Sequence, residues 1–149
     1  MKILLSRFAE LNCGWNIRAL DERDLFRLCK RFELVVIELP QQTSGFYFSM
    51  NGRHFITVSS ALRGQRRLFV LFHEFAHFYL HAPQSGYAAR FHGVGYKTRS
   101  ETEADLFASC AILPYPTITQ NLGEVILEEF GIPEDILAQR LAILERYGI

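Results

Sequence analysis

Most hydrophobic residues in this chain recur every three to four positions, which is the spacing of one face of an α-helix. The pattern predicts helices over residues 3–12, 21–32, 65–82 and 101–112, then a helix pair broken at 131–133. Asp21 is placed to cap the second helix. In the last helix, the stripe expected to face the core consists of Ile136, Leu137, Leu141 and Leu144. Residues 83–99 contain several glycines and no period, so we expect a loop there.

A second pattern, of β-branched and aromatic residues, predicts strands between the second and third helices. The run Leu34–Ile37 is typical of a buried strand. Residues 46–50 and 53–59 flank Asn51-Gly52, a dipeptide that favours the two-residue turn of a β-hairpin. We therefore expect a short antiparallel sheet packed against several helices, which is an α+β fold. The length fits one domain over residues 1–149, because no repeat or linker divides the chain.

The composition narrows the possible functions. Hydrophobic residues make up 49% and charged residues 21%, so the chain can bury a core and is not expected to be disordered. Sixteen Lys and Arg balance sixteen Asp and Glu, which argues against direct binding of nucleic acid through its phosphates. The longest apolar runs, such as Leu68–Phe72, are too short to cross a membrane. The three cysteines form no C-x-x-C pair, which favours a reducing cytoplasm over a disulfide framework.

One short motif in the third predicted helix carries chemistry. His73-Glu74-Phe75-Ala76-His77 is an H-E-x-x-H sequence. Side chains four residues apart lie on one helical face, so both imidazoles can reach a single Zn²⁺. Glu74 lies beside that face, where it could take a proton from a water molecule as general base. The alternative is a helix with two unrelated histidines, but its flanks are apolar nearly all round, and buried polar groups need partners.

A catalytic zinc site needs a third protein ligand beside an open position. His81 is badly placed, because it follows His73 by eight residues, about 12 Å along the helix axis. The next helix begins with Glu101 and Asp105, which are four residues apart and share a face. We favour Glu101 as the third ligand, and Asp105 as the acceptor for the N–H group of a ligating histidine.

Glu103 is the alternative third ligand. It is two residues from both Glu101 and Asp105 and therefore points away from their shared face. Ser100 and Glu103 also match a capping box, which would explain this glutamate without a metal. Taken alone, the acids at this helix start would be explained by the helix dipole. The small residues Ala104 and Ala108 would let the helix approach the H-E-x-x-H helix closely.

These motifs together resemble the ImmA/IrrE family of metallopeptidases. The resemblance rests on His73–His81, on the pattern Glu101-x-x-Ala104-Asp105 and on Ile112–Pro114, and it covers roughly residues 20–147. It implies a small zincin-like fold with Glu74 as general base and with Zn²⁺ held by His73, His77 and Glu101. It further implies a zinc-dependent endopeptidase that cleaves a helix-turn-helix transcriptional repressor in a bacterial or mobile-element regulatory system. The repressor would be a separate DNA-binding protein.

A second function remains open at this point. The same ligands could stabilise a regulatory module that docks a protein partner without cleaving it, and the two functions differ at the open coordination position. The sequence does not identify substrate-binding residues. Tyr87, His92 and Tyr96 are candidates to stabilise the oxyanion. If residues 55–59 lie at a sheet edge, an extended substrate could pair with them.

Overall fold

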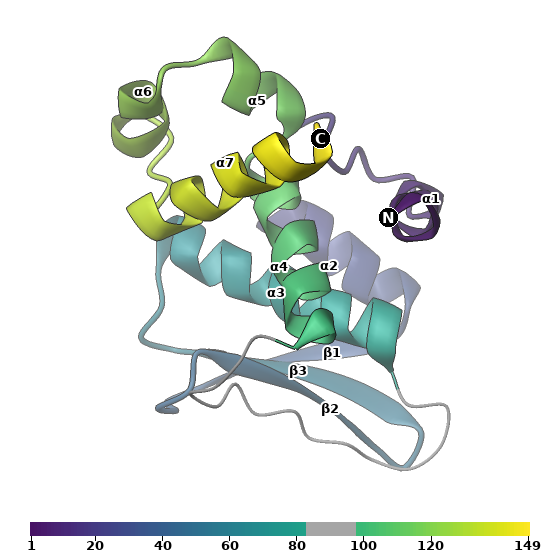
Figure 1. The fold of residues 1–149 in the computed structure, drawn as a ribbon. Coiled ribbons are helices and arrows are strands. Elements are labelled where there is room, and N and C mark those ends of the chain that lie inside the picture. The colour runs from purple at the N-terminus through teal and green to yellow at the C-terminus, as the bar shows by residue number, and fades with distance from the viewer. Residues whose placement is uncertain (83–97) are drawn as a thin grey trace.

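A computed structural model describes residues 1–82 and 98–149, which form helices on a three-stranded sheet (Figure 1). The helices expected over 3–12, 21–32, 65–82 and 101–112 are present, and their bounds differ from the expected ones by no more than two residues. The elements are α1 (Lys2–Glu10), α2 (Glu22–Arg31), β1 (Leu34–Leu39), β2 (Gly45–Met50), β3 (Arg53–Ser59), α3 (Gly64–His81), α4 (Arg99–Ile112), α5 (Tyr115–Gln120), α6 (Gly123–Glu128) and α7 (Glu134–Tyr147). The α+β class is confirmed.

The sheet is mixed, so the expectation of an antiparallel sheet holds only for the hairpin. β2 and β3 pair antiparallel around Asn51 and Gly52, whose φ angles of 52° and 74° are those a two-residue hairpin turn requires. β1 pairs parallel with β3, with Leu34 opposite His54. The reason is the connection: β2 reverses the direction of β1, and β3 reverses it again and inserts between them.

The strand order β1-β3-β2 makes β3 the central strand. Residues 55–59 hydrogen-bond to strands on both sides, so the expected substrate-pairing edge is not located there. Within the described residues, the outer edges of the sheet belong to β1 and β2. Any extended segment that joins the sheet must therefore use one of these two strands.

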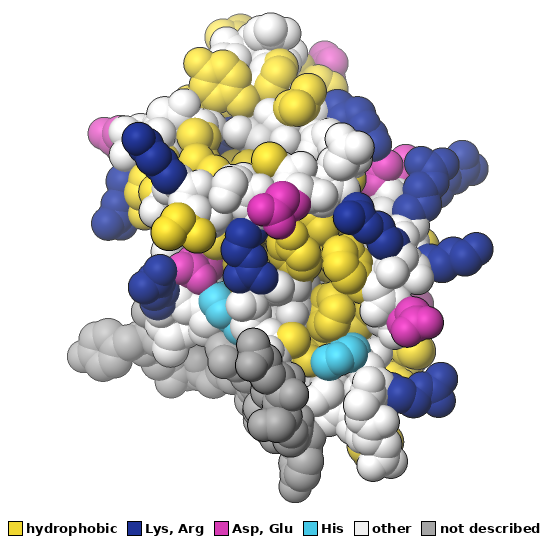
Figure 2. Space-filling view, turned by 90° about the vertical axis from the view of Figure 1, so that its right-hand side faces the viewer, with side chains coloured by type: hydrophobic (Ala, Val, Ile, Leu, Met, Phe, Trp, Pro, Cys, Tyr) yellow, Lys and Arg dark blue, Asp and Glu magenta, His cyan; other side chains and the backbone are white. Residues whose placement is uncertain are grey.

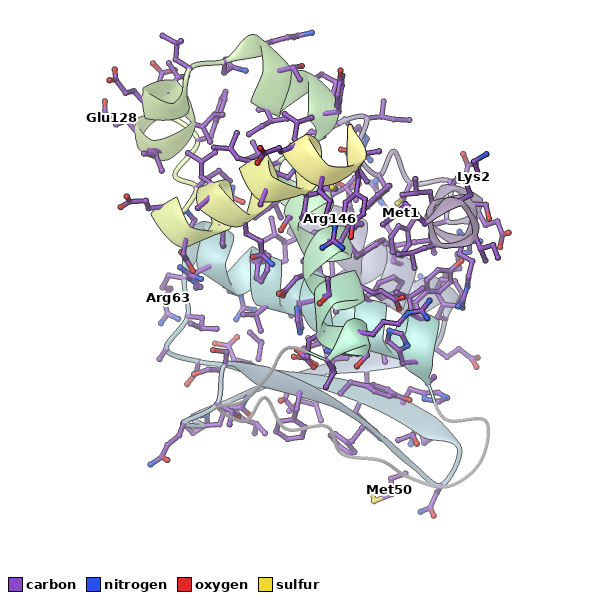
Figure 3. All side chains as sticks on the ribbon, viewed as in Figure 1. Met1, Lys2, Met50, Arg63, Glu128 and Arg146 are labelled. Atoms are coloured by element: carbon purple, nitrogen blue, oxygen red, sulfur yellow. The ribbon has the colours of Figure 1, made fainter. Side chains whose placement is uncertain are left out.

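Helix α3 lies across one face of the sheet, and α4 packs across α3 on the other side (Figure 1). Ala76 of α3 and Ala104 and Ala108 of α4 are fully buried, as expected for two helices in close approach. Side chains of the helices fill the space between them (Figure 3). Trp15 also donates its indole N–H to the Phe107 carbonyl at 2.9 Å, which ties the segment after α1 to α4. None of the described helices is long and apolar enough to span a membrane.

The tail differs from the expected pair of helices. Two short helices, α5 and α6, precede Gly131, and α7 follows it. Leu141 is 47% exposed, whereas Arg140 on the neighbouring position is fully buried. The Arg140 guanidinium donates to the Leu113 carbonyl at 2.7 Å and to the Asn16 side-chain oxygen at 3.1 Å. The carbonyl groups at the end of α4 need hydrogen-bond donors, which a leucine side chain lacks. This need explains why Arg140 is buried and Leu141 is exposed.

The expected cap of α2 at Asp21 is confirmed. The Asp21 carboxylate accepts from the Asp24 backbone N–H and the Asp24 carboxylate accepts from the Asp21 N–H, each at 2.9 Å. Arg18 donates to both oxygens of Asp24, at 2.7 and 2.9 Å. This ion pair lowers the pKa of Asp24 to about 2.

Replacing Asp24 by Asn should destabilise the protein at neutral pH and much less in acid. Because the folded-state pKa of Asp24 is depressed, the carboxylate stabilises the fold above pH about 4, and this stabilisation is lost as the pH falls toward about 2. Half-exposed Arg18 limits the ion-pair contribution, so the free energy of unfolding at pH 7 should fall by about 1–2 kcal/mol. Urea denaturation at pH 7 and pH 3 measures the difference, with exposed Arg23→Gln as control. A loss of equal size at both pH values would contradict this account.

Candidate metal centre

Helix α3 supplies two histidines whose ring nitrogens face each other. His73 and His77 lie one turn apart on the buried side of α3, and their Nε2 atoms are 3.0 Å apart. Both side chains are almost fully buried, as is Glu74 beside them. Helical spacing sets this arrangement locally, because residues four apart stand one above the other.

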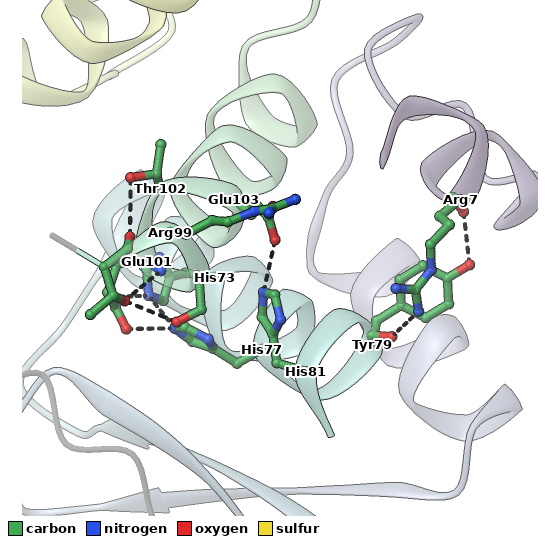
Figure 4. Close-up of polar contacts among 11 residues, drawn as sticks. Arg7, His73, His77, Tyr79, His81, Arg99, Glu101, Thr102 and Glu103 are labelled. Atoms are coloured by element: carbon green, nitrogen blue, oxygen red, sulfur yellow. Dashed lines mark hydrogen bonds and ion pairs between the residues drawn. The ribbon is translucent and has the colours of Figure 1, made fainter. Parts of the chain in front are cut away.

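Helix α4 brings a carboxylate to the same point (Figure 4). Glu101 places Oε1 3.0 Å from Nε2 of His77 and Oε2 3.2 Å from Nε2 of His73. The structure thus brings together the three residues that the sequence singled out as ligands. One ligand atom from each lies within 4.8 Å of the others, in a group that could hold a metal ion.

The donor set fits a metal ion of the zinc type. Nitrogen and oxygen ligands bound tetrahedrally to one zinc ion lie roughly 3.3 Å from one another. The distances of 3.0 to 3.2 Å among the three side chains are close to that value. Two imidazoles and one carboxylate are also the ligand types that zinc prefers in open sites.

Asp105 orients His73 from the far side of its ring. The Asp105 carboxylate lies 2.8 Å from Nδ1 of His73, so Nδ1–H donates to it and the Nε2 lone pair faces Glu101 and His77. Burial lowers the pKa of His73, but the hydrogen bonds with Asp105 and Glu101 outweigh it and raise the pKa to about 9. The surrounding carboxylates therefore favour a positive charge at this point, which a divalent cation would supply.

Glu103 faces away from the two histidines. Its carboxylate accepts from Nε of Arg99 at 2.8 Å and lies 3.2 Å from Nε2 of His81 (Figure 4). The expected capping box of Ser100 and Glu103 is wrong, because α4 begins at Arg99 and Thr98 caps it. The earlier start places Glu103 beyond the capping position of the first turn. The His81 ring lies near that of His77, but its polar contact is with Glu103, and it is not a member of the ligand group, in agreement with the distance argument along the helix.

A cleft of about 590 Å³ opens onto this group. Its lining includes His73, Glu74, Glu101 and Asp105. Sequence reasoning did not assign the rest of the lining to the site. Part of it precedes the histidines on α3, namely Arg66, Phe69 and Val70, and part comes from segments distant along the chain, namely Gln42, Thr43, Ser44, Asp135 and Gln139. Arg66 of α3 donates to Asp135 of α7 at 2.8 Å, which joins the two helices beside the cleft. The candidates Tyr87, His92 and Tyr96 lie outside the described residues.

Gly45 is a further residue that the sequence analysis missed. A Cβ atom there would lie 2.5 Å from the Thr57 carbonyl, 2.8 Å from Cγ1 of Val70 and 3.3 Å from Cγ of Glu74. The first residue of β2 therefore lies directly against the side chain after the first histidine. A glycine in a strand pattern often marks such a close approach, and that was the available signal.

One comparison with known proteins found a match. A family model described as the IrrE N-terminal-like domain of peptidase family M78 matches residues 29–142. The matched segment runs from the end of α2 into α7 and contains every residue of the metal group. None of the curated proteins and none of the solved structures compared with the chain matches it significantly.

Metal analysis of purified variants should separate Glu101 from Glu103. Wild type should retain about one zinc ion per chain after dialysis, while His77→Ala and Glu101→Ala lose it because a donor is missing. Asp105→Asn should weaken zinc binding about 10–100-fold, since the His73 ring exchanges a charged carboxylate acceptor for a neutral amide oxygen. Glu103→Ala is the matched control and should retain zinc. Loss of zinc in Glu103→Ala with retention in Glu101→Ala would reverse the assignment.

Gly45→Ala should disturb the contact between β2 and α3. The backbone of Gly45 suits alanine, but the added methyl meets a carbonyl that cannot move alone, so we expect a loss of about 1–3 kcal/mol in the free energy of unfolding. Gly123→Ala is the control, because its Cβ would meet only Leu137 at 3.9 Å. Thermal or urea unfolding measures both variants. Equal stability of Gly45→Ala and wild type would show that β2 does not press on Glu74.

Proposed function

The chain belongs to the family of IrrE N-terminal-like domains, a metallopeptidase-type family, and from this we propose that it is a zinc-dependent endopeptidase. The observation that carries the proposal is the convergence of His73, His77 and Glu101 from two helices beside an open cleft. Glu74 lines the same cleft, next to one of the two imidazoles. This combination provides a metal group, a carboxylate and access for a substrate.

Zinc is the metal that we propose for the three side chains. When bound, it would supply Lewis-acid chemistry, polarising a peptide carbonyl and making water more acidic. His73, His77 and Glu101 would hold it, with Asp105 fixing the ring of His73. Three protein ligands leave a position open to substrate, as hydrolytic zinc sites require.

Glu74 is the proposed general base. Its carboxylate accepts a proton from the attacking water and then donates that proton to the amine leaving the cleaved peptide bond. Almost complete burial of Glu74 keeps bulk water away from this transfer. Gly45 leaves the space that the Glu74 side chain occupies beside β2.

The substrate that we propose is a protein segment in extended form. Gln42, Thr43 and Ser44 precede β2 and line the cleft, and β2 is an edge strand within the described residues. A substrate backbone could hydrogen-bond to this edge while its scissile carbonyl lies near His73 and Glu74. From the family resemblance, we infer that this substrate is a helix-turn-helix repressor encoded separately.

All three cysteines of the chain are free, which supports a cytoplasmic location.

A docking module without hydrolysis is the competing function. It would need a fourth protein ligand or a closed site, because a structural metal leaves no open position. In the described part of the chain, the metal group has three members and borders a cleft. This favours hydrolysis over docking alone.

Glu74→Gln tests the proposed function directly. The variant should bind zinc as wild type does, because glutamine leaves the three ligands intact, and should cleave about 10²–10⁴-fold more slowly, because the amide cannot accept the proton. The measurement is cleavage of purified helix-turn-helix repressors encoded beside the gene, followed by mass spectrometry of the products. His77→Ala is the control that loses zinc and cleavage together. Equal cleavage by Glu74→Gln and wild type would exclude Glu74 as the base.

A further inference from the structure

A second cavity, of about 530 Å³, lies away from the metal group among α1, α3, α4 and α7. Its walls include Leu4 of α1, Leu80 of α3, Leu106 of α4 and Tyr147 of α7, which together provide an apolar lining. The volume is in the range of sites that hold small organic ligands. Nothing in the proposed peptidase reaction uses this cavity.

Three arginines surround the apolar lining: Arg7, Arg99 and Arg146. Among the described residues that line the cavity, Glu103 is the one acid, and Arg99 already hydrogen-bonds to it at 2.8 Å. The lining therefore carries an excess of positive charge. Figure 2 shows the side of the molecule that bears α1, where hydrophobic side chains are bordered by Lys and Arg. Figure 3 shows Arg146 on the side of α7 nearest α1.

Aromatic rings lie beside two of the arginines, and a hydrogen bond holds one of them, Arg7, in place. The guanidinium carbon of Arg7 lies 5.2 Å from the centre of the Tyr79 ring, and that of Arg146 lies 5.2 Å from the centre of the Tyr147 ring. Arg7 also donates to the Tyr79 carbonyl at 2.8 Å, and Tyr79 donates its hydroxyl to the Arg7 carbonyl at 2.7 Å (Figure 4). Cations fixed before binding lose little entropy when an anion arrives, which favours affinity.

We propose that this cavity binds a small amphipathic anion, with a carboxylate or phosphate group at the arginines and an aliphatic or aromatic body on the leucines. The charged group accounts for the arginines and the apolar body for Leu4, Leu80 and Leu106. A neutral apolar ligand would bring no anionic partner to Arg7 and Arg146, whereas Arg99 already has Glu103. A purely polar anion would leave the leucines in contact with water.

The cavity is placed to act on the metal group. Thr102, Glu103 and Leu106 line it from α4, the same helix that carries Glu101 and Asp105 towards the histidines. Leu80 lines it from α3, which carries the histidines themselves. A ligand that contacts both helices changes the free energy of their relative placement, so its binding and zinc binding should be coupled. The binding itself does not depend on the proposed peptidase activity.

Calorimetric titration of the zinc-loaded protein with decanoate and decyl phosphate tests the site. We expect saturable one-to-one binding of both, at least tenfold weaker binding of decanol, and no binding of decyltrimethylammonium. Decanol binding as tight as that of decanoate would overturn the proposal, because the arginines would then contribute nothing. Absence of saturable binding of both anions would overturn it as well.

Matched charge removals locate the site. Arg146→Met should weaken decanoate binding about tenfold, because one charge-assisted hydrogen bond is lost. Arg23→Met removes an exposed arginine of α2 that does not line the cavity, and should bind decanoate as wild type does. Arg146→Gln replaces Arg146→Met if the latter does not fold. Unchanged decanoate binding in a folded Arg146 variant would place the ligand elsewhere and overturn the assignment.

The coupling has its own readout, which is the zinc affinity measured against a competing chelator. Saturating decanoate should change the zinc dissociation constant at least threefold in wild type and leave it unchanged in the Arg146 variant. If decanoate leaves the zinc dissociation constant of wild type unchanged, the proposed coupling is wrong, although the binding site itself can still be correct. Because neither measurement involves cleavage, failure of this proposal is distinct from failure of the peptidase assignment.

Discussion

The close approach of α3 and α4 is the constraint on which the rest of the structure depends. Ala76, Ala104 and Ala108 are completely buried where the two helices meet, so no larger side chain holds them apart. Only at that separation does Glu101 reach both histidines at 3.0 to 3.2 Å. The apolar packing of α4 against α3 thus sets the geometry of the polar site formed by the first turns of α4.

That site gathers negative charge among largely buried side chains at the bottom of the cleft. Glu74, Glu101 and Asp105 surround His73, and their combined influence raises its pKa despite burial. Such an arrangement is costly unless a cation or proton balances it. An excess of buried negative charge would destabilise an ordinary core. In a metal-dependent hydrolase the same excess attracts the divalent cation to its ligands. The cavity on the opposite side of α4 has the reverse character, with arginines around an apolar lining, so one helix separates an anionic centre from a cationic pocket.

The differences between expectation and structure share a physical cause. Local patterns predicted helices α1 to α4, the Asn51-Gly52 turn and the Asp21 cap, because each depends on neighbours in sequence. They could not predict that β1 pairs parallel with β3, that Arg140 rather than Leu141 faces the core, or that Gly45 lies against Glu74. These outcomes depend on groups far apart along the chain, such as the carbonyl of Leu113 that Arg140 satisfies.

The amino-acid sequence by itself determined the pair of imidazoles and the neighbouring Glu74, since four-residue spacing on a helix places them without help from the rest of the chain. It also narrowed the third ligand to a choice between Glu101 and Glu103. The tertiary structure decided which of the two glutamates lies beside the histidines. The point where α4 begins and the way it crosses α3 turn Glu101 towards the histidines and Glu103 towards Arg99 and His81. Sequence spacing determines which residues share a face of a helix, but tertiary packing determines which face contacts a neighbouring helix.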